Sequence, residues 1–331
     1  MITKTISILN LNVSCYNHCK HCLLSWNNKL LGIDYERSIK YARSFFEWLK
    51  KNHPNISFIY YFGYSMEHPK LFDVIKFCQE TNSPSGKFLQ FDGMKKRNKE
   101  ELKEFILKLK ESGIELLDFT FYGTKEFHDK FAGRSGDYEL MMDSIEVALE
   151  IGMNLEVGIV VTKDNLNQLD ELVNIFESKN IRLFLFTPHS QGRGKNLIKS
   201  KITIDDYNNL SDRVKKYFNR QNNKTQKEWK ETILDEVKYR SLQLSLLESN
   251  IDKLEKQSFE ETFKELENMD EKYYSIIPSF KELLKIYCDQ SDKNLYSKKD
   301  LYLVYRKKFI KENNIIINDI SDERFSGSVR F

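Results

Sequence analysis

The sequence predicts an α/β fold, a partial (β/α)6 barrel followed by a mainly helical C-terminal extension. Apolar runs of strand length alternate with segments of helical periodicity, a strand comes first, and the alternation stops near residue 195. Alternating elements of this kind form a parallel sheet with helical crossovers, and six units, each led by a strand, in roughly 190 residues are enough for an open, partial barrel.

The first expected strand is residues 5–13, where apolar and polar side chains mostly alternate. The first expected helix is residues 35–51, with Ile39, Ala42 and Leu49 at helical spacing. Further strands are expected at residues 56–62, 87–91, 116–122, 154–161 and 182–187, and further helices at 70–81, 99–112, 137–151 and 166–179. Ligands on such a sheet bind beyond the carboxyl ends of the strands.

The pattern changes after Gly194, where a polar stretch without strand signal runs to about residue 224. We therefore divide the chain into a barrel, residues 1–195, and a helical extension with a short degenerate cap, residues 196–331. Residues 226–274 are highly charged with apolar side chains at helical intervals, which predicts amphipathic helices that pack on the barrel or bind a partner. In the tail, residues 301–305 and 315–317 have the character of strands.

Composition limits the function classes. The 331 residues carry 52 basic and 49 acidic side chains, and this formal charge of +3 argues against nucleic acid as a partner. No apolar run is long enough to cross a bilayer and the N-terminus lacks the regions of a signal peptide, so we expect a cytoplasmic protein with no membrane partner. Five cysteines, three of them within eight residues, are typical of a reduced compartment and a metal site.

Cys15, Cys19 and Cys22 form the most informative motif, on a loop that follows the first expected strand. Thiolates are the usual ligands of iron–sulfur clusters, and this spacing lets one loop reach three irons of a cubane. The fourth iron then stays open to a ligand, as in catalytic metal sites. The alternatives are a zinc site completed by His18 or His21, and three unrelated core thiols.

The motif and its position resemble the cluster loop of the radical SAM superfamily, and the resemblance covers roughly residues 5–195. Three segments also resemble strands 4 to 6 of its peptide-modifying, SPASM-related branch: residues 119–134, 160–165 and 187–194. The resemblance implies one [4Fe-4S] cluster, with S-adenosyl-L-methionine (SAM) chelated at the open iron. It implies reductive cleavage of SAM to methionine and a 5′-deoxyadenosyl radical, which abstracts hydrogen from a substrate.

By this resemblance the favoured substrate is a ribosomally made peptide, so that the activity is peptide modification, with a reducing donor such as flavodoxin or ferredoxin as partner. One alternative is a radical SAM enzyme that acts on a small metabolite. Another is a catalytically decayed, SAM-binding regulatory module. The resemblance implies which cofactors the protein binds, but it does not identify the substrate, because one fold serves many substrates.

One segment departs from the family pattern. After strand 2 the family usually carries Gly-Gly-Glu-Pro, which binds the SAM amine, whereas residues 62–69 here read Phe-Gly-Tyr-Ser-Met-Glu-His-Pro. Ser65 stands where the glutamate is expected, and Glu67 lies two residues further on. We therefore take Tyr64, Ser65 and Glu67 as candidates for SAM binding, with two alternatives: either Ser65 and backbone carbonyls meet the amine, or the loop is rebuilt so that Glu67 reaches it.

Three further residues are candidates for SAM. Arg193 offers a planar guanidinium to the carboxylate or ribose of SAM, although it is equally explained as an exposed arginine in a glycine loop. Thr120 and Thr162 stand at strand ends where hydroxyls would meet the ribose, although threonine is also a common strand residue.

Cys288 is the single cysteine after Cys78, so an auxiliary cluster, which needs several thiols, is not expected. A thiol donates hydrogen to a substrate radical in peptide epimerases of the superfamily, and Cys288 is a candidate for that role. The alternative is a buried structural cysteine.

Overall fold

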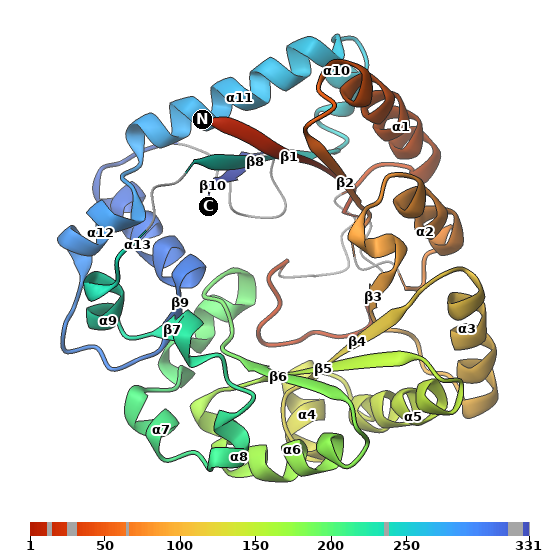
Figure 1. Ribbon diagram of the computed structural model, residues 1–331, viewed down its shortest axis with the longest axis vertical. Coiled ribbons are helices and arrows are strands. Elements are labelled where there is room, and N and C mark those ends of the chain that lie inside the picture. Colours follow the sequence, from red (N-terminus) through yellow and green to blue (C-terminus); the bar gives the residue numbers. More distant parts are fainter. Residues whose placement is uncertain (12–14, 25–31, 64–65, 235–237, 317–326, 331) are drawn as a thin grey trace.

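The structure is a computed structural model that describes residues 1–11, 15–24, 32–63, 66–234, 238–316 and 327–330. Two four-stranded sheets curve around a common centre, and most helices lie outside them (Figure 1). Within these ranges no helix combines the length and the apolar character needed to cross a membrane.

The first sheet has the order β10-β8-β1-β2, and β1 pairs in parallel with both β2 and β8. Its strands are β1 Ile2–Leu9, β2 Ser57–Tyr61, β8 Tyr239–Ser245 and the antiparallel β10 Gly327–Arg330. The second sheet has the order β3-β4-β5-β6, and all of its strands are parallel. Its strands are β3 Phe88–Gln90, β4 Leu116–Phe121, β5 Asn154–Val160 and β6 Arg182–Phe186.

Helices connect consecutive strands, which confirms the predicted α/β class and the open, partial barrel. They are α1 Tyr35–Asn52, α2 Leu71–Glu80, α3 Lys99–Glu111, α4 Lys125–Ala132, α5 Asp137–Glu150 and α6 Leu169–Glu177. The expected strands and helices of this part agree with the structure to within a few residues at each end, apart from residues 12 and 13 of the first expected strand, which lie outside the described residues. One helix, α4, was missed, because its eight residues follow β4 closely and lie in what the sequence predicted as a loop.

Local chemistry explains where these helices begin. In α1 the Asp34 side chain accepts a hydrogen bond from the backbone N–H of Arg37, and in α3 Asn98 and Glu101 form a reciprocal capping box. The sixth helix begins later than predicted because a 3-10 turn, Lys163–Gln168, comes first and is capped in the same way by Thr162.

Strand alternation sorts the side chains between the two faces of the second sheet. In β4 the side chains of Leu117, Phe119 and Phe121 are fully buried in the core that the sheet shares with its helices. Because successive strand residues point to opposite faces, Asp118 and Thr120 project toward the inside of the barrel. The ionisable groups of β4 therefore face the place where a ligand of the fold would bind.

The C-terminal part consists mainly of helices. They are α7 Ile204–Asn208, α8 Asp212–Lys215, α9 Gln226–Glu231, α10 Ile251–Leu254, α11 Phe259–Ile276, α12 Phe280–Tyr287 and α13 Lys298–Glu312. Two short strands, β7 Asn223–Lys224 and β9 Tyr296–Ser297, pair antiparallel. The predicted packing on the barrel holds for part of this stretch, since Phe263 and Leu266 of α11 share a core with Leu242 and Leu244 of β8. Trp229 of α9 packs instead against α12 and α13, and Ile233 is exposed.

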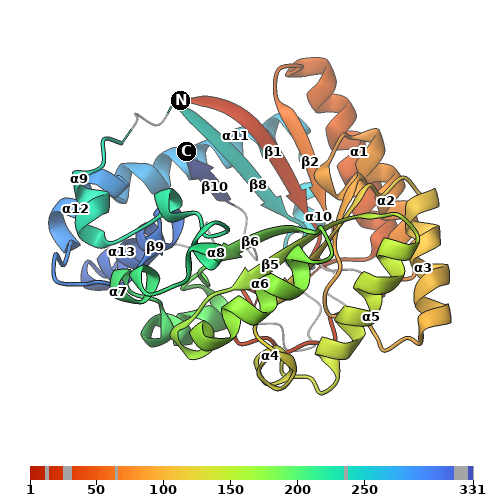
Figure 2. The same cartoon turned by 60° about the horizontal axis from the view of Figure 1, so that its bottom comes forward.

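Two predictions for this part were wrong. Residues 239–245, expected to be helical, form β8 beside β1 (Figure 2), because Arg240, Leu242 and Leu244 alternate on the face that α11 covers. Residues 301–305, expected as a strand, lie inside α13, whose first turn is capped by the Ser297 side chain. Residues 315 and 316 belong to no strand, and residue 317 lies outside the described residues.

Candidate functional site

The cysteine loop, residues 15–24, lies against segments that follow the strands of the second sheet. The backbone N–H of Tyr16 donates to the Gly93 carbonyl, 2.8 Å away, in the segment after β3. The N–H groups of His18 and Lys20 donate to the carbonyls of Ala132 and Phe131 at the end of α4, at 2.8 and 3.0 Å. The loop therefore sits at the carboxyl ends of the strands, where ligands of such sheets bind.

The three thiols of this loop lie close enough for their charges to interact, and the thiols of Cys15 and Cys19 are desolvated. The pKa of Cys15 is raised to about 11, mainly by burial and to a smaller extent by the charges of Asp92 and Cys22, against the lowering effect of a hydrogen bond with the Asn17 backbone. Burial also raises the pKa of Cys19, and Cys15 and Cys22 add to the effect. Thiolates held together without solvent repel one another, and a positively charged metal centre removes that repulsion. The three residues thus have the chemistry of a metal site.

The arrangement is compatible with a cubane. Within the described ranges, no three His, Cys, Asp or Glu side chains converge on a point that would hold one metal ion. A cubane binds each thiolate through a different iron, so its ligands do not have to converge. His21, a candidate for the zinc alternative, packs its ring against Tyr122 and Phe131, with ring centroids 5.1 and 5.8 Å apart.

Gly93 makes room for the first cysteine. Its φ is +64°, and a Cβ atom there would lie 2.2 Å from the Sγ of Cys15. Only glycine satisfies both the left-handed backbone and the close approach. Sequence reasoning missed this residue, although an Asp-Gly pair directly after the third expected strand is a signal that would have identified the turn.

The turn at Gly192 and Arg193 closes the other side of the loop. A Cβ at Gly192 would lie 2.2 and 2.4 Å from the carbonyl oxygens of Leu23 and Cys22, so this backbone also approaches too closely for a side chain. The Arg193 N–H donates to the Cys22 carbonyl at 3.0 Å, and its Nε donates to the Cys19 carbonyl at 2.9 Å. Arg193, predicted to bind SAM, is therefore beside the cysteines, and its contact with SAM stays a prediction.

Two carboxyl groups that sequence reasoning missed lie on the inner side of the second sheet. Desolvation raises the pKa of Asp92 to about 7, while hydrogen bonds from Thr120 lower it; the Thr120 N–H lies 3.0 Å from Oδ1 of Asp92. The pKa of Asp118 is raised to about 8, mainly by desolvation and to a smaller extent by the charges of Asp92 and Glu156. Thr120, a candidate for the SAM ribose, thus has a protein partner already.

Glu67 is engaged by an ion pair. Its two carboxylate oxygens accept hydrogen bonds from Nη1 and Nη2 of Arg97 at 2.6 and 2.9 Å, and Oε1 also accepts from the backbone N–H of Lys95. The side chains of Glu67 and Arg97 are only 10% and 8% exposed. The other two candidates of this segment, Tyr64 and Ser65, lie outside the described residues.

Thr162 and Cys288 are placed differently from the rest. Thr162 is fully buried, and its hydroxyl and N–H both donate to the Asn165 side chain in the capping box before α6. Cys288 follows α12, and its charged neighbours are Lys230, Glu231 and Asp289. None of these neighbours belongs to the cysteine loop, so the described contacts do not bring Cys288 to the other candidates.

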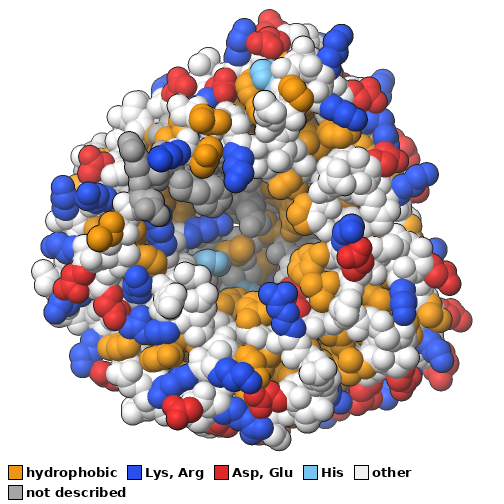
Figure 3. Space-filling view, in the orientation of Figure 1, with side chains coloured by type: hydrophobic (Ala, Val, Ile, Leu, Met, Phe, Trp, Pro, Cys, Tyr) orange, Lys and Arg blue, Asp and Glu red, His pale blue; other side chains and the backbone are white. Residues whose placement is uncertain are grey.

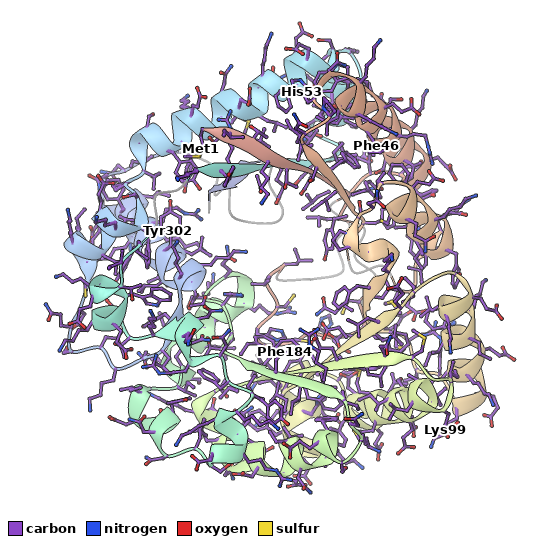
Figure 4. The ribbon with its side chains drawn as sticks, viewed as in Figure 1. Met1, Phe46, His53, Lys99, Phe184 and Tyr302 are labelled. Carbon is purple, nitrogen blue, oxygen red and sulfur yellow. The ribbon has the colours of Figure 1, made fainter. Side chains whose placement is uncertain are left out.

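A hollow opens at the centre of the face seen in Figure 3, with hydrophobic, basic and histidine side chains around it. Phe184 lies on the inner side of β6 (Figure 4), stacked on Phe186 with ring centroids 5.6 Å apart. Gly158 of β5 leaves space for these rings, since a Cβ there would lie 2.7 Å from Phe184. The inner face thus combines an aromatic area with the carboxyl groups of Asp92 and Asp118.

No family model matches the chain. The AdoMet-dependent heme synthase of Oleidesulfovibrio alaskensis is 28% identical over 105 residues, which are 30% of this chain and 26% of that protein. The Fe-coproporphyrin III synthase of Methanosarcina barkeri is 22% identical over 105 residues, 31% of this chain and 26% of that protein. The matches therefore span about a quarter of the length of these curated relatives.

Two similar solved structures are described as native anSMEcpe with bound AdoMet and as coproporphyrinogen III oxidase (HemN) from Escherichia coli, a radical SAM enzyme. The first has a TM-score of 0.44 and 16% identity, over 61% of this chain and 57% of that chain. The second has a TM-score of 0.42 and 12% identity, over 62% of this chain and 49% of that chain.

The predicted resemblance to the radical SAM superfamily is confirmed by the curated relatives. The finer resemblance to the SPASM-related branch stays a prediction.

Proposed function

We propose that this chain, similar to radical SAM proteins, is a radical SAM enzyme that holds one [4Fe-4S] cluster on Cys15, Cys19 and Cys22. The observation that carries the proposal is that the three thiols lie close enough for their charges to interact, in a loop that the backbone approaches closely at Gly93 and Gly192. When bound, the cluster and SAM supply one-electron cleavage of the sulfonium, and hydrogen is then abstracted from a substrate.

The chain's own residues bind and orient these groups. Arg193 fixes the backbone of the cysteine loop through the carbonyls of Cys19 and Cys22. For SAM we retain the residues expected from sequence: Tyr64, Ser65, Glu67, Thr120, Thr162 and Arg193. Because Glu67 already binds Arg97, its carboxylate would have to share that cation or exchange it for the SAM amine.

Radical SAM chemistry requires a substrate and a reductant, and we propose flavodoxin or ferredoxin as the donor. A ribosomally made peptide remains our proposed substrate, with the inner face around Phe184 as the surface it would meet. A small-molecule substrate is the second candidate, favoured by the names of the curated relatives, a heme synthase and an Fe-coproporphyrin III synthase. We also propose a cytoplasmic location, because the five cysteines are all free thiols.

Anaerobic reconstitution tests the proposal. We expect about four irons and four sulfides per chain, as one cubane requires, and close to none after combined replacement of Cys15, Cys19 and Cys22 by alanine. The matched control is the double variant Cys78→Ala and Cys288→Ala, which removes thiols outside the loop and should keep the full iron content. Full iron content in the triple variant would refute the assignment. A value of about eight irons or more would indicate an auxiliary cluster.

A further inference from the structure

We infer that Tyr122 is a positioning residue for the middle cysteine of the loop. The Tyr122 hydroxyl donates a hydrogen bond to Sγ of Cys19, and this bond raises the reduction potential of the cluster. The inference rests on the proposed function, since it concerns a ligand of the proposed cluster. It adds a residue that neither the sequence pattern nor the relatives assign.

The contact itself is short and enclosed. Tyr122 follows β4 directly, and its Oη lies 3.3 Å from Sγ of Cys19. The Tyr122 side chain is 3% exposed, so water does not compete for the hydroxyl. A phenol is protonated at neutral pH and has one proton to donate, and thiolate sulfur is an acceptor for it.

Aromatic neighbours hold the ring in this orientation. Tyr122 stacks on Phe131 with centroids 4.6 Å apart and planes at 24°. The rings of His128 and His21 lie 4.9 and 5.1 Å away. A ring packed among three others has one accessible rotamer, so the hydroxyl remains directed at Cys19.

The backbone of Tyr122 is fixed by side chains of neighbouring elements. Its carbonyl accepts a hydrogen bond from Nδ2 of Asn165 at 2.6 Å, and its N–H donates to Nδ1 of His128 at 3.4 Å. Because Nδ1 accepts, the ring proton of His128 is on Nε2, which lies 3.2 Å from Oδ2 of Asp137. The same carboxylate oxygen accepts from Nδ2 of Asn17 at 2.8 Å.

These contacts form one hydrogen-bond network that begins and ends in the cysteine loop. Starting at Asn17 of the cysteine loop, they pass through Asp137 of α5, His128 of α4 and Tyr122 to Cys19, two residues further along the same loop. His128 and Asp137 are 0% and 1% exposed, so the middle of this hydrogen-bond network is shielded from solvent. A hydrogen bond in such surroundings is stronger than one in water.

The expected effect follows from charge. Reduction adds an electron to the cluster and its thiolates, and a hydrogen bond to a ligand sulfur stabilises that added negative charge. Loss of the hydroxyl therefore lowers the reduction potential, although the ligand set stays the same. A tyrosine that served only to fill space would leave the potential unchanged when its hydroxyl alone is removed.

The test compares Tyr122→Phe with Tyr60→Phe, which also removes a buried hydroxyl, one that lies 2.8 Å from the Ser38 hydroxyl. Each reconstituted chain is checked for its circular dichroism spectrum and iron content, and the potential is measured by a redox titration monitored by electron paramagnetic resonance. We expect equal iron contents, a more negative potential in Tyr122→Phe, and the wild-type potential in Tyr60→Phe.

An unchanged potential in Tyr122→Phe would overturn the inference while the proposed function stood. Loss of the cluster from a folded Tyr122→Phe chain would also overturn it, because the bond would then serve assembly and not the potential. Absence of a cluster in the wild-type chain would instead remove the proposed function.

Discussion

The two sheets of the barrel differ in how they hold their desolvated ionisable groups. In the second sheet, Asp118 and Thr120 of β4 point inward, beside Asp92 and the cysteine loop. In the first sheet, Arg240 of β8 points outward and forms ion pairs with α11, whereas inner positions such as Ser7 and Gln243 are uncharged. The second sheet therefore keeps desolvated carboxyl groups on its inner side, whereas the first sheet neutralises its buried arginine within the fold.

The largest effect should come from Gly93→Ala, in the segment that follows β3 of the second sheet. A methyl group there would lie 2.2 Å from Sγ of Cys15, so the ligand must move and we expect the reconstituted chain to lose most of its iron. Gly152→Ala is the matched control: its φ is +73°, and the nearest atom to an added Cβ is the flexible Lys110 Nζ at 3.6 Å. Both variants carry the left-handed penalty of about 1 kcal/mol. Equal iron contents would contradict the close approach at Cys15.

Arg240→Ala should act on stability alone. It leaves Asp270, which is 0% exposed, without its cation 2.9 Å away, and loss of one partner of a buried pair costs about 3–5 kcal/mol. We expect a lower midpoint of denaturant unfolding and an unchanged iron content at low denaturant. In the other sheet, Arg182→Ala removes an arginine that is 77% exposed, and its cost should stay below about 1 kcal/mol. Similar losses in both variants would contradict the comparison.

Glu67→Gln separates a structural from a ligand-binding role. The carboxylate of Glu67 accepts two hydrogen bonds from Arg97 in largely buried surroundings, so we expect a loss of about 1–3 kcal/mol in the free energy of unfolding. If Glu67 also meets the SAM amine, SAM affinity falls while the iron content is kept. The control for both the unfolding and the SAM-affinity measurements is Glu80→Gln, because Glu80 forms an exposed ion pair with Arg43. Unchanged SAM affinity in Glu67→Gln transfers the role to Ser65 or the backbone.

The last effect concerns pH. The pKa of Asp118 is raised from 3.8 to about 8, so between these values the folded chain binds more protons than the unfolded chain. The free energy of unfolding contributed by this group therefore falls as the pH rises from about 4 to about 8. Asp118→Asn should be more stable than wild type at pH 8, by about 1–3 kcal/mol, and equal to it near pH 4. Glu104→Gln, at an exposed position, should show no such difference. If the stability of Asp118→Asn depended on pH as that of the wild type does, Asp118 would not be a desolvated carboxyl group without a compensating charge.

Local patterns were enough to predict the alternating strands and helices and to single out the three cysteines. They failed at β8, because the alternation of Arg240, Leu242 and Leu244 lies in a highly charged stretch whose partner strand is at the other end of the chain. The inner face was predicted poorly for the same reason. Asp92 becomes unusual only through desolvation by distant segments, and the bond between Tyr122 and Cys19 joins residues 103 apart in sequence.

The most direct test of the account measures 5′-deoxyadenosine after the reconstituted chain is mixed with SAM and dithionite under anaerobic conditions. We predict that the wild-type chain releases 5′-deoxyadenosine and methionine in equal amounts, and that the chain lacking Cys15, Cys19 and Cys22 releases none. A wild-type chain that binds its full cluster and SAM but releases no 5′-deoxyadenosine would contradict the proposed activity and favour a regulatory module.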